Sequence, residues 1–177
     1  MMRIDRIAAA AGLVAIGVLS GCSDRPAGLT DPDVARGSRA PAGPVVVEVG
    51  HPDRGTDYFP PGSHDASYHA QDRISPRTTV ISPGATVEFR IAAGHNVAVY
   101  APGVTPADID LSTAAPIISG FPPILDDPGD RIARTAVNFG PTVSWSMTFD
   151  EPGLYLVICE VLPHFVSAKM YAWVRVG

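Results

Sequence analysis

The chain has 177 residues, of which 46% are hydrophobic, and a formal net charge of −5 at pH 7. A mildly acidic sequence without a cluster of lysines and arginines is a poor candidate for binding nucleic acid, which requires cations that neutralise phosphates. Its 18 prolines and 17 glycines favour short elements separated by turns over long helices.

The N-terminus has the pattern of an export signal. Arg3 and Arg6 precede an apolar run over residues 7–19, and Ser20, Gly21 and Cys22 follow it. This order is typical of a secretory signal peptide, and the run is too short to cross a bilayer as a helix. The ending Leu-Ser-Gly-Cys resembles the lipobox of bacterial lipoproteins, which implies that residues 1–21 are removed and that Cys22 is lipidated. The alternative is an ordinary signal peptide cut nearby, in which Cys22 is incidental.

The exported part divides into a tether and one domain. Residues 22–43 are rich in Pro, Gly, Ala, Arg and Asp, which predicts a flexible tether, and residues 44–177 have the size of a single domain. We therefore expect an exported, membrane-anchored lipoprotein, on the periplasmic side of a bacterial membrane or at the cell surface. Its contact with the membrane would come from acyl chains on Cys22 and not from basic residues.

Alternating apolar and polar residues predict a series of short β-strands in the domain. The predicted strands cover residues 45–49, 78–82, 86–91, 96–100, 143–149, 154–159 and 170–176. Residues 154–159 are apolar on both faces, which is typical of an inner strand that is covered on both sides. In residues 170–176, Met170, Ala172, Val174 and Val176 share one face.

Evidence for helices is scarce. The sequence Thr105-Pro106-Ala107-Asp108 has the pattern of a helix N-terminus, and it predicts one short helix inside a long connection over residues 101–142. Several short strands with little helix indicate an all-β protein. We predict a two-sheet Greek-key β-sandwich whose long connection carries one short helix.

Cysteine usage points to a metal. The chain has only two cysteines, so Cys159 has no partner if Cys22 is acylated. Exported domains usually pair their cysteines in disulfides, so a remaining thiol needs another explanation. Metal ligation is one explanation, and a buried, inert thiol is the alternative.

Four residues together have the composition of a copper site. Cys159, His164 and Met170 follow one another near the C-terminus, and His95 begins a predicted strand in the segment GHNVAVY. A thiolate, two imidazoles and a thioether are the ligands of blue copper. Each residue alone has an ordinary structural explanation, but their order, their placement at strand ends and the unpaired thiol favour copper.

These segments resemble the cupredoxins, the group of plastocyanin, azurin and pseudoazurin. The segment Gly153-Leu154-Tyr155-Leu156-Val157-Ile158-Cys159 is similar to the strand that leads to the copper cysteine of that family, and Pro163-His164 is similar to its exposed copper histidine. The resemblance implies one Cu(I)/Cu(II) ion held by His95, Cys159 and His164 in the equatorial plane and by Met170 as the axial ligand. It also implies that the backbone of Asn96 helps to hold the cysteine sulfur and that the domain is a monomeric electron carrier.

The sequence departs from the family pattern in two places. Five residues separate His164 from Met170, and Lys169 stands where the family usually has a glycine. The connection over residues 101–142 is also longer than in small electron carriers. Glu160 or a backbone carbonyl therefore remains an alternative to Met170 as the weak ligand.

Apolar residues surround the second histidine. Leu162, Pro163, Phe165 and Val166 flank His164. We predict that they form a small apolar patch around an exposed histidine edge, where redox partner proteins dock transiently.

Other polar groups have simpler interpretations. The histidines of the glycine- and proline-rich stretch predict a solvated loop, and the aspartates around Pro128-Gly129 predict a turn, because they do not match a calcium-binding loop. These residues are His51, His64, His69, Asp126, Asp127 and Asp130.

The predicted function is the transfer of single electrons between partners outside the cytoplasm, without catalysis. Copper enzymes of the same fold place histidines beside the copper cysteine, whereas Cys159 lies between Ile158 and Glu160. Two alternatives remain from the sequence. One is a lipoprotein that stores or delivers copper, and the other is a metal-free, cupredoxin-like interaction module.

Overall fold

The computed structural model describes residues 34–36, 43–50 and 72–177. The predicted signal peptide, the lipidation site Cys22, most of the tether, and His51, His64 and His69 lie outside the described residues. Within the described part of the chain, no helix combines the length and the apolar character needed to cross a membrane.

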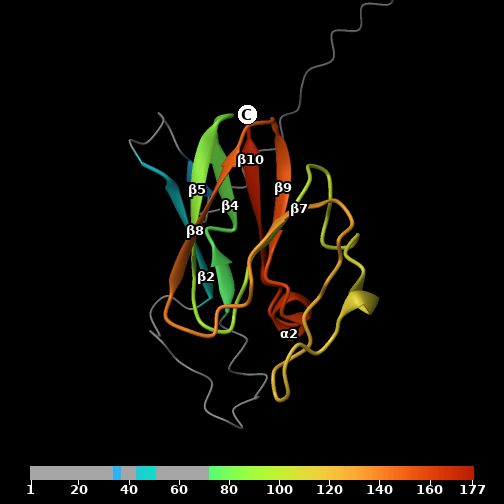
Figure 1. Cartoon of the computed structure of the whole chain (residues 1–177). Coiled ribbons are helices and arrows are strands. Elements are labelled where there is room, and N and C mark those ends of the chain that lie inside the picture. Colours follow the sequence, from blue (N-terminus) through green and yellow to red (C-terminus); the bar gives the residue numbers. More distant parts are fainter. Residues whose placement is uncertain (1–33, 37–42, 51–71) are drawn as a thin grey trace, which may run out of the picture. The chain divides into compact units, whose positions relative to one another are not determined.

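The described strands form two sheets that face each other (Figure 1). The six-stranded sheet has the order β1 (Val34–Arg36), β4 (Thr78–Ile81), β10 (Tyr171–Val176), β9 (Gly153–Ile158), β6 (Ala98–Tyr100) and β7 (Arg131–Arg134). The four-stranded sheet has the order β3 (Arg73–Ser75), β2 (Val45–Gly50), β5 (Ala85–Ile91) and β8 (Val143–Phe149). The predicted all-β sandwich is therefore confirmed.

Alternation along the strands places the main core between the sheets. Val87, Phe89 and Ile91 of β5 are buried, and the intervening Arg90 is exposed. On the opposite sheet Ala172 and Val174 are buried in the same core. Burying every second side chain is what fixes the strand register, because a shift by one residue would turn the apolar set toward solvent.

The long connection over residues 101–142 covers the outer face of the six-stranded sheet. Leu156 and Ile158 of β9 pack there against Ile109, Leu125 and other apolar side chains of a second core cluster. The alternate residues of β9 face the main core. From Tyr155 to Ile158, β9 is thus buried on both faces, as its sequence predicts, whereas Leu154 is 37% exposed.

The prediction of a helix beginning at Thr105 is wrong. The carboxylate of Asp108 accepts hydrogen bonds from the backbone N–H and the hydroxyl of Thr105, at 2.8 and 2.7 Å, and closes a tight turn. This contact is one half of a capping box, which favours a helix start, but the chain makes only one turn at residues 106–108 and does not continue as a helix. The connection instead carries the 3₁₀-helix η2 (Leu111–Thr113), and the described residues form an α-helix, α2, at Leu162–Val166.

Three short strands were not predicted. Strand β1 lies inside the segment predicted as a tether and pairs in parallel with β4. Strand β3 pairs with β2, and β7 pairs with β6 at the edge of its sheet. Each has only three or four residues, too few to show a clear alternation.

Candidate metal centre

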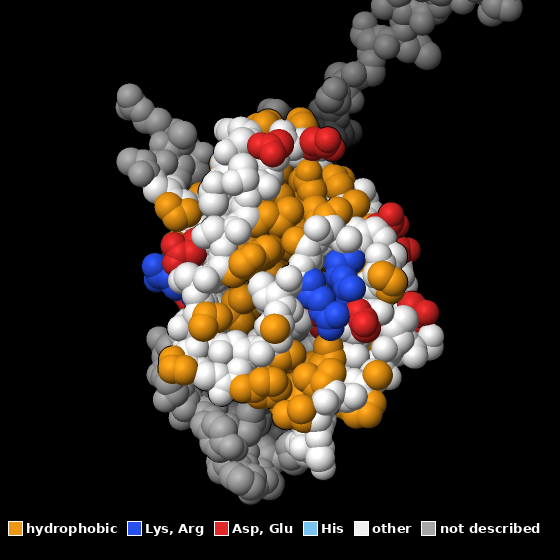
Figure 2. Space-filling model, in the orientation of Figure 1, with side chains coloured by type: hydrophobic (Ala, Val, Ile, Leu, Met, Phe, Trp, Pro, Cys, Tyr) orange, Lys and Arg blue, Asp and Glu red, His pale blue; other side chains and the backbone are white. Residues whose placement is uncertain are grey.

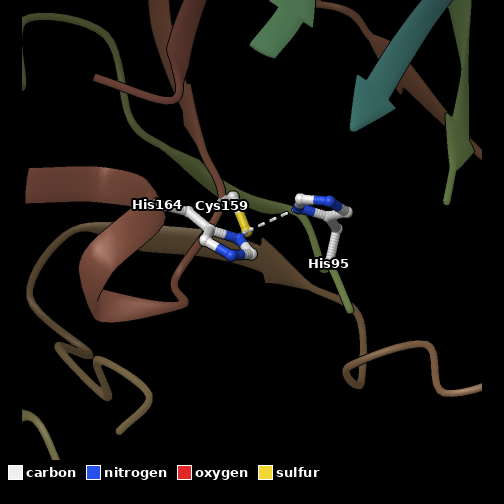
Figure 3. A group of neighbouring side chains, drawn as sticks. All are labelled: His95, Cys159 and His164. Atoms are coloured by element: carbon white, nitrogen blue, oxygen red, sulfur yellow. Dashed lines mark hydrogen bonds between the residues drawn. The ribbon is translucent and has the colours of Figure 1, made fainter. Parts of the chain in front are cut away.

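The structure brings His95, Cys159 and His164 together at one end of the sandwich (Figure 3). Nδ1 of His95 lies 3.7 Å from Sγ of Cys159, and Nδ1 of His164 lies 3.6 Å from it. The ligand atoms of the three residues lie within 4.8 Å of one another, and all three residues are buried. This cluster can hold a metal ion.

Three separate elements position these side chains. His95 precedes β6 and pairs with Asn138 in an isolated bridge, while Cys159 directly follows β9. His164 belongs to α2, a single helical turn. The helix begins at Leu162 and has Pro163 in its first turn. Because β6 and β9 are hydrogen-bonded neighbours, the two ends that carry His95 and Cys159 lie side by side.

Backbone hydrogen bonds close the loop between Cys159 and Met170. The N–H of Cys159 donates to the carbonyl of Met170 at 3.1 Å, and the N–H of Met170 donates to the carbonyl of His164 at 3.0 Å. Leu162 N–H also donates to the carbonyl of Pro123, at 2.9 Å, which ties the loop to the long connection. The position of α2 thus depends on contacts from another part of the chain.

Met170 and Lys169 lie at the end of the loop that follows His164, where the sequence departs from the family pattern. Met170 is fully buried in the main core, and its role as axial ligand stays a prediction. Lys169 has φ +53°, the left-handed conformation that favours glycine. The backbone therefore adopts a conformation suited to the usual glycine although the side chain is lysine, at a cost of about 1 kcal/mol.

Asn96 connects the sulfur to Glu160. The Asn96 Oδ1 atom accepts a hydrogen bond from the backbone N–H of Glu160 at 2.9 Å and lies 3.8 Å from Sγ of Cys159. Its Nδ2 atom donates to the Glu160 carboxylate. The side chain of Asn96 therefore fixes the backbone on both sides of the cluster, a contact that the resemblance alone did not indicate.

Glu160 does not serve as a metal ligand in this arrangement. Its fully buried carboxylate accepts hydrogen bonds from Arg131 at 2.9 Å and from Arg134 at 2.6 Å. Both arginines also bind Asp126, at 2.9 and 2.8 Å. Figure 2 shows one group of Lys and Arg side chains near β7 with acidic side chains beside it, and a smaller basic group at the left edge of this face. Pairing offsets the cost of burying the carboxylate and holds Glu160 outside the cluster, which argues against Glu160 as the weak ligand, and the alternative of a backbone carbonyl stays open.

The aspartates of the long connection stabilise the fold through hydrogen bonds and ion pairs. Asp126 binds the arginines of β7, and the carboxylate of Asp127 accepts hydrogen bonds from the N–H groups of Asp110 and Gly129, both at 2.9 Å. These contacts agree with the turn predicted around Pro128-Gly129.

One residue at the cluster was missed by the sequence analysis. Asp72 lies 3.7 Å from Nε2 of His95 through Oδ1 and 3.7 Å from Nε2 of His164 through Oδ2. It precedes the short strand β3, and no motif around it signals a role. Only its distance to both rings in the folded chain could have identified it.

The electrostatic environment keeps the free thiol protonated. Burial raises the pKa of Cys159 to about 12, and the carboxylates of Asp72 and Glu160 act in the same direction. Hydrogen bonds to the backbone of Asn96 and Val161 oppose this rise. A bound cation would reverse the balance, because a thiolate ligand is stabilised by the charge of the metal. One thiolate and two neutral imidazoles, all buried, are a donor set that suits copper.

The expectation of an exposed histidine edge is wrong. The ring of His164 is fully buried, because Nδ1 faces the sulfur and Nε2 faces Asp72. Phe165 is only 6% exposed and packs in the outer cluster, whereas Val166 is 39% exposed. Leu162 and Pro163 are half-buried.

The fold resembles solved cupredoxin structures. An auracyanin from the photosynthetic bacterium Roseiflexus castenholzii is 24% identical, with a TM-score of 0.43 over 59% of this chain and 87% of that one. Auracyanin B is 22% identical, with a TM-score of 0.47 over 78% and 91%. Pseudoazurin from Methylobacterium extorquens is 21% identical, with a TM-score of 0.39 over 76% of each chain. No protein-family model and no curated protein sequence matches the chain. These are likenesses of fold, and the chemistry of the site follows from its own atoms.

Gly50 makes room for the first histidine, and Gly50→Ala tests this contact. Gly50 has φ +109°, and a Cβ atom there would lie 2.8 Å from Cδ2 and 3.0 Å from Nε2 of His95, and also 2.8 Å from Cβ of Ala92. We expect the free energy of unfolding to fall by about 2 kcal/mol or more, because backbone strain and crowding of the ring add. Urea denaturation of the metal-free protein measures the change.

The matched control is Gly103→Ala. Gly103 has φ +97° and open space around its Cβ position, so this variant has the backbone strain without the crowding. Equal losses of stability in the two variants would contradict a role of Gly50 in placing His95.

Proposed function

We propose that this protein is a mononuclear type 1 copper protein that carries single electrons between redox partners. The observation that carries the proposal is the approach of two buried imidazole Nδ1 atoms to one buried sulfur, at 3.7 and 3.6 Å. His95, Cys159 and His164 would hold the ion, and Met170 would supply the weak axial contact. Bound copper would supply a one-electron Cu(I)/Cu(II) couple.

The scaffold supports such a role by keeping its side chains in place. His95 and Cys159 sit at the ends of paired strands, and the loop of His164 is bound to the connection and to Met170 by backbone hydrogen bonds. Burial excludes water from the cluster. A rigid and dry site changes little when its charge changes by one unit, which favours rapid electron transfer.

Two alternatives from the sequence have less support. Delivery of copper to an acceptor requires access to the ion, whereas His95 is 3% exposed and Cys159 and His164 are fully buried. A metal-free interaction module would have no evident use for two imidazoles packed around a thiol. Catalysis is not part of the proposal, since Cys159 has no histidine directly beside it in the sequence, and its polar sequence neighbour Glu160 is bonded to Arg131 and Arg134.

The proposal also includes an exported lipoprotein anchored through Cys22. Its support is the order of basic residues, apolar run, small residues and cysteine at the N-terminus. The acyl chains would keep the carrier at a membrane surface outside the cytoplasm.

The purified protein loaded with Cu(II) should absorb intensely in the visible range, because charge moves from the Cys159 thiolate to the ion. Cys159→Ser should abolish this band, since the hydroxyl oxygen of serine cannot replace the soft sulfur as the donor of charge to copper. Absorption and electron paramagnetic resonance spectra check the result. A colourless wild-type protein would overturn the proposed function.

The affinity for Cu(I) should rise about tenfold per pH unit between pH 7.5 and 9. The thiol, whose pKa burial raises to about 12, must release one proton before it can ligate, so each pH unit below that pKa costs about tenfold in affinity. Competition with a chelator of known pH dependence measures the slope, and Cys159→Ser serves as the control without it. An affinity independent of pH would show that the thiolate is not a ligand.

We propose that α2 and its exposed Val166 form the centre of the docking patch, with Leu162 and Pro163 at its side and the buried Phe165 as support. Val166→Glu should slow electron self-exchange between oxidised and reduced copies about tenfold, because two like charges would meet at the contact. Line broadening in nuclear magnetic resonance spectra of mixed samples measures this rate.

The matched control is Val143→Glu, since Val143 is 46% exposed on β8 of the other sheet. Unchanged visible spectra would show that the metal site remains intact in both variants. Equal self-exchange rates in the two variants would place docking elsewhere.

A further inference from the structure

The outer nitrogen atoms of both histidines face one carboxylate. Oδ1 of Asp72 lies 3.7 Å from Nε2 of His95, and Oδ2 lies 3.7 Å from Nε2 of His164. Asp72 is 8% exposed, and it is not among the residues whose ligand atoms converge. One buried side chain therefore spans two rings that come from distant parts of the chain.

We propose that Asp72 is a positioning residue that orients both imidazoles and favours the oxidised state of the site. The part of this inference that concerns the oxidised state rests on the proposed copper function. The other part, the orientation of the rings, concerns the metal-free protein as well.

The orientation follows from the chemistry of imidazole. A neutral ring carries its proton on one nitrogen and a lone pair on the other, and a nearby carboxylate favours the proton on the nitrogen that faces it. With the proton on Nε2, each Nδ1 lone pair points toward the sulfur side of the ring, where Sγ of Cys159 lies 3.7 and 3.6 Å away. Carboxylates that hold ligand histidines in this way support metal sites in other proteins.

The use of both carboxylate oxygens couples the two rings. The ring centroids lie 4.5 Å apart with an angle of 40° between the planes. A separation of 3.7 Å is that of an electrostatic contact and exceeds a strong hydrogen bond, so Asp72 acts mainly through its charge. A substitution that keeps the shape and removes the charge is therefore the informative one.

The same charge bears on the redox equilibrium. The oxidised site carries one more positive charge than the reduced site, and a fixed negative charge stabilises the more positive state. The interaction is strong in a buried environment because the effective dielectric constant is low there. Asp72 should therefore oppose reduction and lower the reduction potential.

The test compares Asp72→Asn with the wild-type full-length protein. We expect the affinity for Cu(II) to fall about ten- to a hundredfold, as is typical when a support of a ligand histidine is lost. The affinity for Cu(I) should fall less, so that the midpoint potential in a mediated titration moves to a more positive value. In the metal-free protein, nitrogen-15 spectra should show His95 and His164 protonated on Nε2 in the wild type and a mixture of tautomers in Asp72→Asn.

Asp127→Asn is the matched control. Asp127 is also 8% exposed, but its carboxylate binds the backbone of Asp110 and Gly129 in the long connection. This control should leave the potential and the tautomers of the two histidines unchanged. A shift of equal size in both variants would show that any loss of buried charge has the same effect, and it would overturn the inference.

The outcomes separate the inference from the proposed function. A wild-type protein that does not become coloured with Cu(II) refutes the function, and the tautomers of the metal-free protein still decide whether Asp72 orients the rings. A coloured wild type with an unchanged potential in Asp72→Asn refutes the inference and leaves the function standing. Should Asp72→Asn fail to fold, Asp72→Glu keeps the charge at a longer reach, and Nδ1-protonated rings in the wild type would refute the inference.

Discussion

The site depends on the burial of one thiol at the end of a strand that is covered on both faces. Strand β9 passes through the middle of the six-stranded sheet, with the main core on one side and the long connection on the other. Cys159 directly follows β9 and lies beside the start of β6 and the loop that carries α2. A sulfur held in this way faces both imidazoles without moving, because the interior on each side of β9 is closely packed.

Charge is arranged around this thiol in two different ways. Glu160 is buried but neutralised by Arg131 and Arg134, and it stabilises the backbone through Asn96. Asp72 approaches the histidines from the outside. The carboxylate of Glu160 supports the backbone, and that of Asp72 faces the two imidazole rings. Removing the first would therefore affect mainly the stability of the fold, and removing the second mainly the orientation of the rings.

The long connection is part of the site. It covers Leu156 and Ile158, supplies the arginines that hold Glu160, and binds Leu162 through the carbonyl of Pro123. A shorter connection would leave the outer face of β9 open to water. The second histidine is enclosed here, and Val166 is the exposed apolar residue of the same helical turn.

The sequence by itself determined the β-sandwich and the candidate ligands. Alternation in β5 and the apolar run of β9 match the burial of those strands, whereas in β8 only Phe149 of the alternating apolar set is buried. The folded chain alone decided the roles of Asp72 and Glu160, the enclosure of His164, the turn at Thr105 and the pairing of β3 and β7. These features arise from contacts between residues far apart in the chain, and the spacing of residues along one segment carries no record of such contacts.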